Sequence, residues 1–259
     1  MLTRFYRKVF ELNGHPIVAN TLRKFAQSSI SKAFIPSFTR LYKLNLQEAS
    51  REIHEYKSLH DLFTRELKTD IRPIANSPDA FISPCDSVLS VVNHLTTESI
   101  FLVKGQEYTV AELLGSKKAA EAYSGGQVLI FYLSPVDYHR VHVPIDAEVT
   151  DAYTLGKEAA PVNNLGLRYG LRPLTRNYRL VTNFKAAGYP FAHVMVGALN
   201  VNSIERTNTN RVVKRGDPYG YFSFGSTVVI CVPKDAFSFT GKIGPVKMGE
   251  EIGKWQGVK

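Results

Sequence analysis

Residues 221–230 read Tyr-Phe-Ser-Phe-Gly-Ser-Thr-Val-Val-Ile, an aromatic run followed by a β-branched run. Both runs favour one continuous β-strand, because aromatic and β-branched side chains pack well on a pleated surface. Gly225-Ser226 interrupts this strand at its middle, and a glycine inside a strand indicates a bulge or a close approach of the backbone. We therefore expect at Gly225-Ser226 either a structural kink or a site where the backbone itself is used.

Strand-like runs of the same kind continue from residue 81 to the end of the chain, separated by Gly, Pro and Asn. They lie at residues 88–92, 128–133, 141–149, 178–184, 191–199 and 228–232, with shorter pieces between 241 and 258. Only residues 109–123 have an obvious helical pattern in this part. The pattern predicts a mainly antiparallel, sandwich-like β-sheet body over residues 70–259.

The first 69 residues are predicted to be helical, because apolar residues recur there at helical spacing. Helices are expected over residues 2–12, from Pro16 to about residue 30, and over 58–67, with a third apolar series at 34–41 that Pro36 breaks. Pro73 and Pro78 mark a linker to the sheet. The fold class is therefore α+β, with N-terminal amphipathic helices in front of the β-sheet body.

Positive charge is concentrated at the start of the chain. The 259 residues carry a formal charge of +9; residues 1–47 hold eight Lys or Arg side chains and one acid, so +7 lies there and only +2 on the rest. A basic patch attracts polyanions, and basic amphipathic helices lie on membranes or bind partners. Nucleic acid and an anionic lipid surface are both candidate ligands; the alternative is that the helices pack on the core and their charges are solvated.

The apolar content is that of a folded protein without a membrane span. No apolar run approaches the roughly 18 residues that a span needs, and no secretory apolar region follows Met1-Leu2-Thr3-Arg4. The two cysteines, Cys85 and Cys231, have no metal-like spacing and indicate a reducing compartment. A cytosolic or peripheral protein is expected.

The densest polar group is Asp137-Tyr138-His139-Arg140-Val141-His142, which lies between Pro135 and Pro144. Prolines and β-branched residues favour a strand over a helix here. Residues three apart in a strand point to opposite faces, so one metal ion cannot easily bind both histidines, and no metal site is expected. A histidine is instead a natural general acid or base near neutral pH.

Asp86 lies in a turn before a β-branched strand, and alone it would be an ordinary turn residue. Together with one of the two histidines and Ser226, it completes the set that nucleophilic serine catalysis requires: an orienting acid, a base and a hydroxyl. The sequence has no Gly-x-Ser-x-Gly motif, which argues against an α/β-hydrolase.

These segments together resemble the phosphatidylserine decarboxylases, which are self-cleaving pyruvoyl enzymes. The similarity runs from about residue 58 to the C-terminus and is carried by the segments Phe63-Thr64-Arg65-Glu66-Leu67-Lys68, Ser83-Pro84-Cys85-Asp86, Asp137-Tyr138-His139-Arg140-Val141-His142-Val143-Pro144, Val196-Gly197-Ala198, Gly220-Tyr221-Phe222 and Phe224-Gly225-Ser226-Thr227. Two positions depart from the family pattern. Ser87 replaces a glycine, and Tyr178 replaces a glutamate between Asn177 and Arg179.

The resemblance implies that the chain is a zymogen that cuts itself between Gly225 and Ser226. In this scheme Asp86 orients His142, His142 removes the proton of Ser226, and the serine oxygen attacks the carbonyl of Gly225. Glycine suits the position before the serine, because it lets the peptide distort. The products would be a β chain of residues 1–225 and an α chain of residues 226–259 that begins with a pyruvoyl group derived from Ser226.

The resemblance also implies the reaction, a pyruvoyl-dependent decarboxylation of phosphatidylserine to phosphatidylethanolamine and CO2. His139 is then the expected proton donor to the carbanion, and a structural histidine is the alternative. Residues 1–69 become the membrane-facing region of a peripheral enzyme on the cytoplasmic face of the cell membrane, with phosphatidylserine in an anionic bilayer as partner, no nucleic acid, and a homo-oligomer as an open possibility.

Three other functions remain open from the sequence. A basic module that binds nucleic acid or an anionic surface without catalysis would use residues 1–47, but it leaves Asp86, the histidines and Gly225-Ser226 unexplained. A pyruvoyl decarboxylase acting on another serine-headed lipid and a conventional serine hydrolase are the alternatives among enzymes.

Overall fold

The computed structural model describes residues 16–92, 95, 98–160, 162, 164–198, 204–223 and 226–258. The helix expected over residues 2–12 lies outside these residues, as do Phe224 and Gly225. Helices come first in the described chain and strands follow, so the predicted α+β class is confirmed. Among the described helices, none combines the length and the apolar character needed to cross a bilayer.

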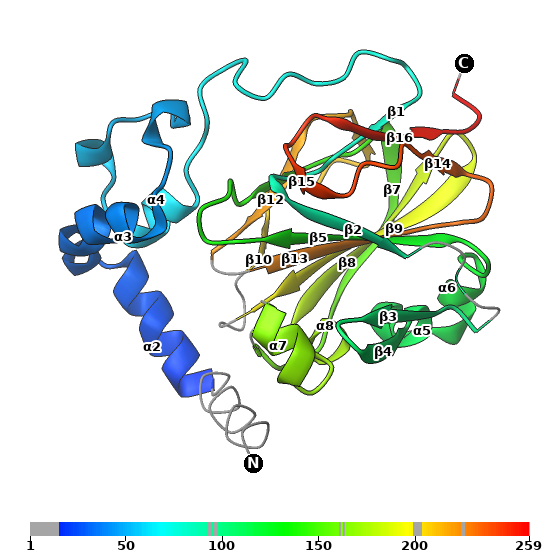
Figure 1. The fold of residues 1–259 in the computed structure, drawn as a ribbon, viewed down its shortest axis with the longest axis horizontal. Helices are drawn as coiled ribbons and strands as arrows, with labels where there is room; N and C mark the ends of the chain where they lie inside the picture. Colours follow the sequence, from blue (N-terminus) through cyan, green and yellow to red (C-terminus); the bar gives the residue numbers. More distant parts are fainter. Residues whose placement is uncertain are drawn as a thin grey trace.

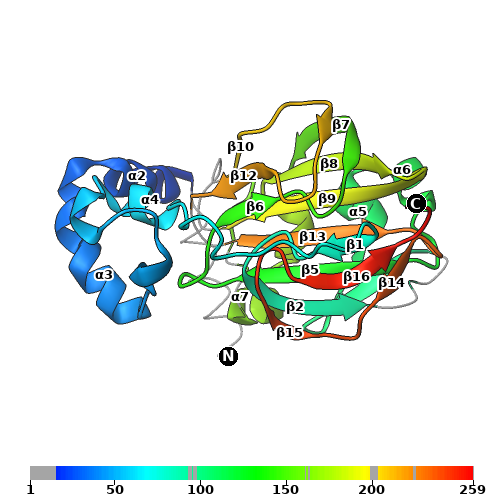
Figure 2. The same ribbon diagram turned by 90° about the horizontal axis from the view of Figure 1, so that it is seen from above.

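The first helices form a group beside the β-sheet body, joined to it by an extended linker (Figures 1 and 2). The group consists of α2 (Pro16–Gln27), η1 (Ser29–Phe34), α3 (Ile35–Tyr42), η2 (Leu46–Glu48), η3 (Ile53–Glu55) and α4 (Leu59–Phe63). It has a small apolar core of its own, in which Ile35, Tyr56 and Leu62 are buried. We call residues 16–69 the helical region below.

Two helix predictions need correction. Pro36 does not break a helix but lies in the first turn of α3, where a proline costs no intrahelical hydrogen bond. The helix expected over residues 58–67 ends at Phe63. Beyond it the backbone turns to pair with the segment around Ala49, since Lys68 N–H donates to the carbonyl of Glu48 and Ser50 N–H to that of Glu66.

The β-sheet body is built around one eight-stranded antiparallel sheet with the order β11-β7-β8-β9-β13-β5-β2-β15. Its strands are β11 (Val212–Val213), β7 (Ala147–Leu155), β8 (Arg179–Ala186), β9 (Tyr189–Gly197), β13 (Ser226–Val232), β5 (Gln127–Leu133), β2 (Ser87–Val92) and β15 (Gly244–Val246). The prediction of a mainly antiparallel sheet is confirmed.

Two three-stranded sheets cover one face of the large sheet (Figure 1). One contains β1 (Ala80–Ile82), β16 (Glu251–Trp255) and β14 (Phe237–Phe239); the other contains β10 (Ile204–Arg206), β12 (Pro218–Phe222) and β6 (Arg140–His142). The other face is covered by the hairpin β3 (Ile100–Val103) and β4 (Gln106–Thr109) and by α5 (Val110–Leu114), α6 (Lys117–Glu121), α7 (Asn164–Tyr169) and α8 (Pro173–Arg176). This layering agrees with the sandwich-like prediction.

Strand β13 is buried on both faces, and its side chains alternate between two apolar cores. Val228 and Ile230 belong to the core under the three-stranded sheets, whereas Val229 and Cys231 belong to the core under the helices. This is the period-two alternation of an extended strand. The start of β13 is therefore held firmly on both sides, by β5 and by β9.

Residues 221–230 form two strands rather than one, as the glycine predicted. β12 ends at Phe222 in a three-stranded sheet, and β13 begins at Ser226 in the eight-stranded sheet. The expected strand 141–149 is likewise divided, because the chain changes sheets between β6 and β7 at Pro144. The helix expected over 109–123 is divided into α5 and α6, since Gly115 ends α5 with φ of 69°.

His193 in β9 gives a prediction about stability. Its side chain is 1% exposed between Phe184 and Tyr219, and neither ring nitrogen has a hydrogen-bond partner on another described residue. Burial lowers its pKa to about 4. Below pH 6.5 the unfolded chain therefore binds more protons at this position, so stability is lost as the pH falls through that window.

We expect His193 to contribute about 2 kcal/mol of lost stability between pH 7.5 and pH 5. Urea unfolding at the two pH values measures this loss. In His193→Leu the difference in the free energy of unfolding between the two pH values should be smaller by that amount, because the leucine takes up no proton. An equal pH dependence in both proteins would show that His193 is not held neutral by the fold.

Candidate active site

Ser226 occupies the first position of β13, where it faces Leu133 of β5 and Gly197 of β9. It is fully buried, and its Oγ has no hydrogen-bond partner among the described residues. A buried unpaired hydroxyl costs about 1–3 kcal/mol, so native structures rarely keep one without a reason. The hydroxyl of Ser226 thus lies buried and unpaired among the described residues where the chain enters the eight-stranded sheet.

His139 lies in the loop that follows β5, close to this junction. Its carbonyl accepts a hydrogen bond from the N–H of Phe222, the last residue of β12. The ring is fully buried and packs on Phe63 of α4, with ring centroids 3.9 Å apart. The loop therefore links the helical region and the end of β12.

The protonation state of His139 follows from its contacts. Nδ1 donates to the carbonyl of Asp137 at 2.9 Å, which places the only ring proton of the neutral form on Nδ1. Nε2 has no partner among the described residues. Burial, helped by the nearby charge of Arg65, lowers the pKa of His139 to about 3. At neutral pH the ring is therefore neutral, and its Nε2 carries a lone pair that is only weakly basic.

His142 is in a different state. Its backbone N–H donates to the carbonyl of Pro84, so it lies beside the turn that carries Asp86. Nδ1 donates to the carbonyl of Gly216 at 2.8 Å, and Nε2 accepts from the hydroxyl of Tyr138 at 3.1 Å. Burial lowers the pKa of His142, and the charge of Asp86 opposes this effect only in part. Both ring nitrogens are thus engaged.

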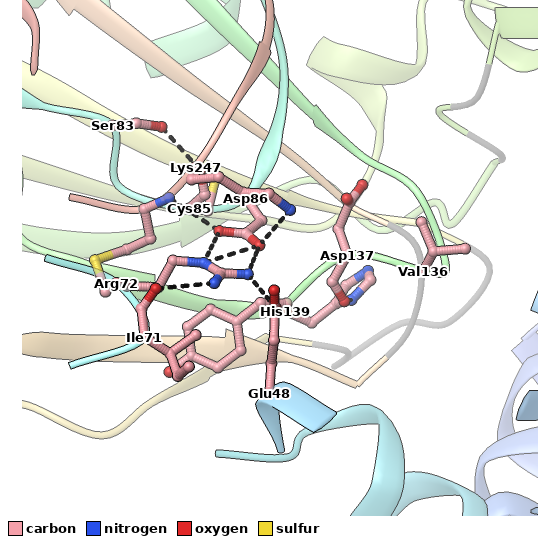
Figure 3. A network of polar contacts seen from close by, with 12 residues as sticks. Glu48, Ile71, Arg72, Ser83, Cys85, Asp86, Val136, Asp137, His139 and Lys247 are labelled. Carbon is pink, nitrogen blue, oxygen red and sulfur yellow. Dashed lines mark hydrogen bonds and ion pairs between the residues drawn. The ribbon is translucent and has the colours of Figure 1, made fainter. Parts of the chain in front are cut away.

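Asp86 is the centre of a buried ion network (Figure 3). Its carboxylate accepts from Arg72 Nη2 at 2.6 Å, from Lys247 Nζ at 3.0 Å and from the N–H of Met248 at 2.9 Å. Arg72 Nη2 also contacts Glu48 of η2 at 2.6 Å. Burial alone would raise the pKa of Asp86, but the hydrogen bonds from Arg72 and Met248 outweigh it and lower the pKa.

The structure brings the predicted residues into one region without joining them into a triad. Asp86 and His142 lie on neighbouring segments, and His139 lies beside the β12–β13 junction. Within the described chain, Asp86 makes no direct hydrogen bond to His142, and Ser226 makes none to either histidine. For Asp86 the physical reason is that Arg72, Lys247 and Met248 already occupy its carboxylate.

Arg72 and Lys247 were missed by the sequence analysis. Arg72 precedes Pro73 in a segment that was interpreted only as a linker, and Lys247 is separated from Asp86 by 161 residues. No local pattern of either residue indicates an ion pair, because each partner lies on a distant part of the chain.

Two adjacent cavities lie between the helical region and the β-sheet body. One has a volume of about 160 Å³ and is lined by Asp86, Asp137 and Lys247, among others. The other has a volume of about 250 Å³ and is lined by His142 and Arg140, among others. Leu67, Arg72 and Tyr138 line both. Of the candidate residues, Asp86 and His142 therefore border a space that a polar group can enter, whereas His139 and Ser226 line neither of these two cavities.

The two departures from the family pattern occupy structural positions. Ser87 is buried as the first residue of β2, opposite Val246. Tyr178 accepts at its carbonyl from the N–H of Gly197, the residue that pairs with Ser226. This contact uses the backbone, so it does not depend on the side chain at position 178.

Comparisons with known proteins agree with the resemblance and extend it. The family described as phosphatidylserine decarboxylase matches residues 59–254. The phosphatidylserine decarboxylase proenzyme of Halalkalibacterium halodurans is 45% identical over 257 residues, covering 98% of this chain and 99% of the relative. Those of Anoxybacillus flavithermus (44% identical, 98% and 97% covered) and of a Geobacillus species (41%, 98% and 99%) are similar. The similarity thus includes the helical region.

Proposed function

The chain belongs to the phosphatidylserine decarboxylase family, and we therefore propose that it converts phosphatidylserine to phosphatidylethanolamine and CO2 after cutting itself between Gly225 and Ser226. The observation that carries the proposal is the hydroxyl of Ser226, which is buried and has no hydrogen-bond partner among the described residues at the point where the chain passes between two sheets. The relatives are named proenzymes, which agrees with a processing step. A nucleic-acid-binding module has no such support.

The self-cleavage starts from Ser226. Its Oγ attacks the carbonyl carbon of Gly225; the peptide C–N bond breaks as the C–O bond of an ester forms. Elimination from this ester releases the carboxylate of Gly225 and leaves a dehydroalanine at position 226. Hydrolysis of that residue takes up one water, releases ammonia and leaves the pyruvoyl group at the start of the α chain. The β chain then consists of residues 1–225 and the α chain of residues 226–259.

We propose that His142 is the base that removes the proton of Ser226. Asp86 is the acidic residue that orients His142. Burial keeps His142 neutral and hence able to accept a proton. Its Nε2 lone pair accepts a hydrogen bond from Tyr138 in this structure, so the transfer requires His142 to exchange that partner for Ser226. Asp86 lies two residues from the carbonyl that binds the His142 backbone, close enough to influence the imidazole electrostatically.

The site fits a pyruvoyl group in one respect that the structure shows, because the Ser226 side chain is buried and makes no hydrogen bond to another described residue. That group would supply a ketone that reacts with the amine of the serine headgroup and accepts electrons as CO2 leaves. The ladder bonds of β13 to β5 and β9 would hold it in place.

His139 moves the proton that this chemistry requires. The headgroup arrives as an ammonium ion, and its amine must lose a proton before it can attack a ketone. Nε2 of the neutral His139 ring has no hydrogen-bond partner among the described residues, so it can take up that proton once the carboxylate and phosphate of the bound headgroup raise the low pKa of the ring. His139 then returns the proton to carbon after CO2 has left, so it is base first and acid second.

The helical region would bring the enzyme to its lipid substrate. Ile30, Phe34 and Leu41 on η1 and α3 are exposed at 70%, 50% and 74%, among basic residues of the same helices. Apolar side chains can enter the interface while each Lys or Arg near an anionic surface adds about 1 kcal/mol. We propose that this face binds the cytoplasmic side of the cell membrane.

Ser226→Ala should remain a single chain of 259 residues, because alanine has no oxygen to attack Gly225. Intact mass and a denaturing gel measure the result, and the smaller fragment of the wild type should be blocked to Edman degradation. Ser90→Ala, which removes an exposed hydroxyl from β2 of the same sheet, is the control and should be cut normally. Two normal fragments from Ser226→Ala would disprove self-processing at this serine.

Substitution of His142 and of His139 should separate self-cleavage from decarboxylation. His142→Ala should stay uncleaved, whereas His139→Ala should be cut normally and lose at least about 100-fold in decarboxylation, the contribution typical of a general acid–base group. Cleavage is read from a gel and decarboxylation from labelled CO2. If His139→Ala is not cut while His142→Ala is, the base of self-cleavage is His139 and our assignment is reversed.

Ile30→Ser combined with Leu41→Ser should weaken binding to phosphatidylglycerol vesicles by about tenfold or more, since two apolar side chains no longer enter the interface. Vesicle sedimentation measures binding. Ile243→Ser is the matched control, because Ile243 is exposed at 67% on the β-sheet body. Equal binding by the double variant and the control would show that the helical region does not hold the protein on the bilayer.

A further inference from the structure

We propose that His60 is a positioning residue for self-cleavage, which holds the chain ahead of the scissile bond through Ser223. This inference rests on the proposed function, because it concerns the rate of the cut between Gly225 and Ser226. It adds a second role for the helical region. Besides facing the membrane, this region would fix the segment that enters the bond to be broken.

The contact joins two distant parts of the chain. His60 lies in α4, and its Nε2 is 3.1 Å from Oγ of Ser223, a residue 163 positions later. Ser223 directly follows β12, is 2% exposed, and precedes the scissile bond by two residues. The ring of His60 also meets the ring of Tyr221 edge-on, with centroids 6.3 Å apart.

The contact between His60 and Ser223 lies next to the scissile bond. β12 ends at Phe222 and β13 begins at Ser226, so the ladders of two different sheets stop on either side of the scissile bond. The Ser226 side is fixed by pairing with Leu133 and Gly197. On the other side, the His60 contact fixes the first residue beyond the ladder of β12.

The segment that carries His60 is itself held firmly against the site. Phe63 packs on His139, the carbonyl of Thr64 accepts from Arg140 Nε, and Arg65 Nη2 donates to the carbonyl of Val136 at 3.1 Å. His60 is therefore a fixed point from which Ser223 can be oriented. An attack on a neighbouring carbonyl depends steeply on such orientation, because a misplacement of about 1 Å can cost two orders of magnitude in rate.

Burial lowers the pKa of His60, so its ring is neutral at pH 7, although Asp61 and Glu205 act in the opposite direction. A neutral ring and a serine hydroxyl can share one proton in either direction. A glutamine side chain also carries a donor and an acceptor, so it can replace the imidazole in this contact. Alanine cannot.

The test follows the self-cleavage of the full chain during cell-free synthesis, from the amounts of uncut and cut protein over time. His60→Ala and Ser223→Ala should each slow the cut about tenfold, the rate equivalent of one hydrogen bond. The double variant should be no slower than either single variant, because both remove the same contact. His60→Gln should restore most of the rate.

His54→Ala is the matched control, since His54 is an exposed histidine of η3 in the same region, and it should be cut at the wild-type rate. Thermal unfolding is compared in the uncleavable Ser226→Ala background. His60→Ala replaces a ring with a methyl group and can lower the melting temperature in that background. In that case Ser223→Ala and His60→Gln decide whether the contact itself sets the rate of cleavage, because neither leaves so large a space.

Wild-type rates for His60→Ala and Ser223→Ala would overturn the inference and leave the proposed function standing. The inference would also be overturned if the double variant slowed cleavage by the product of the two single-variant factors, because the two residues would then act independently. A wild-type chain that is never cut would instead contradict the proposed function, and the inference would fall with it.

Discussion

The chain must leave one sheet and enter another within the few residues between Phe222 and Ser226, and the rest of the site depends on this constraint. Strand pairing fixes a backbone through its ladder, and both ladders end here. On the far side of the junction, Ser226 is held by two neighbouring strands. The hydroxyl of Ser226 is therefore firmly placed at the point where the chain enters the second sheet.

The buried ion pair of Asp86 and Arg72 connects the entrance of β2 to the helical region. Arg72 bridges Asp86 at the entrance of β2 and Glu48 in η2, so one guanidinium group contacts both the sheet and the helices (Figure 3). Such a pair adds little net stability, because desolvation of the charges offsets their attraction, yet loss of one partner costs about 3–5 kcal/mol. The main effect of this ion pair is to fix how the helical region packs on the β-sheet body around the two cavities that Arg72 lines.

His139 and His142 are three residues apart, and their different surroundings give them different chemistry. Nε2 of His139 has no hydrogen-bond partner within the described chain, and burial against Phe63 strongly lowers the pKa of the ring. His142 has both nitrogens engaged, by Gly216 and by Tyr138. Under the proposed function, Nε2 of His139 can receive a proton without breaking a hydrogen bond to a described residue, although burial makes the ring a weak base, whereas His142 must first give up its bond to Tyr138. Two steps that need separate bases can thus be served by one short segment.

The sequence by itself determined the order of helices and sheet, the main strands and the break at Gly225-Ser226, because side-chain periodicity and glycine report local burial and backbone freedom. The similar motifs also marked Asp86, His139, His142 and Ser226. Only the tertiary structure decided that β12 and β13 belong to different sheets, and that Asp86 binds Arg72 and Lys247. It also decided that His60 reaches Ser223. These partners are 14 to 163 residues apart, and such pairs are chosen by the path of the whole chain, which no local pattern records.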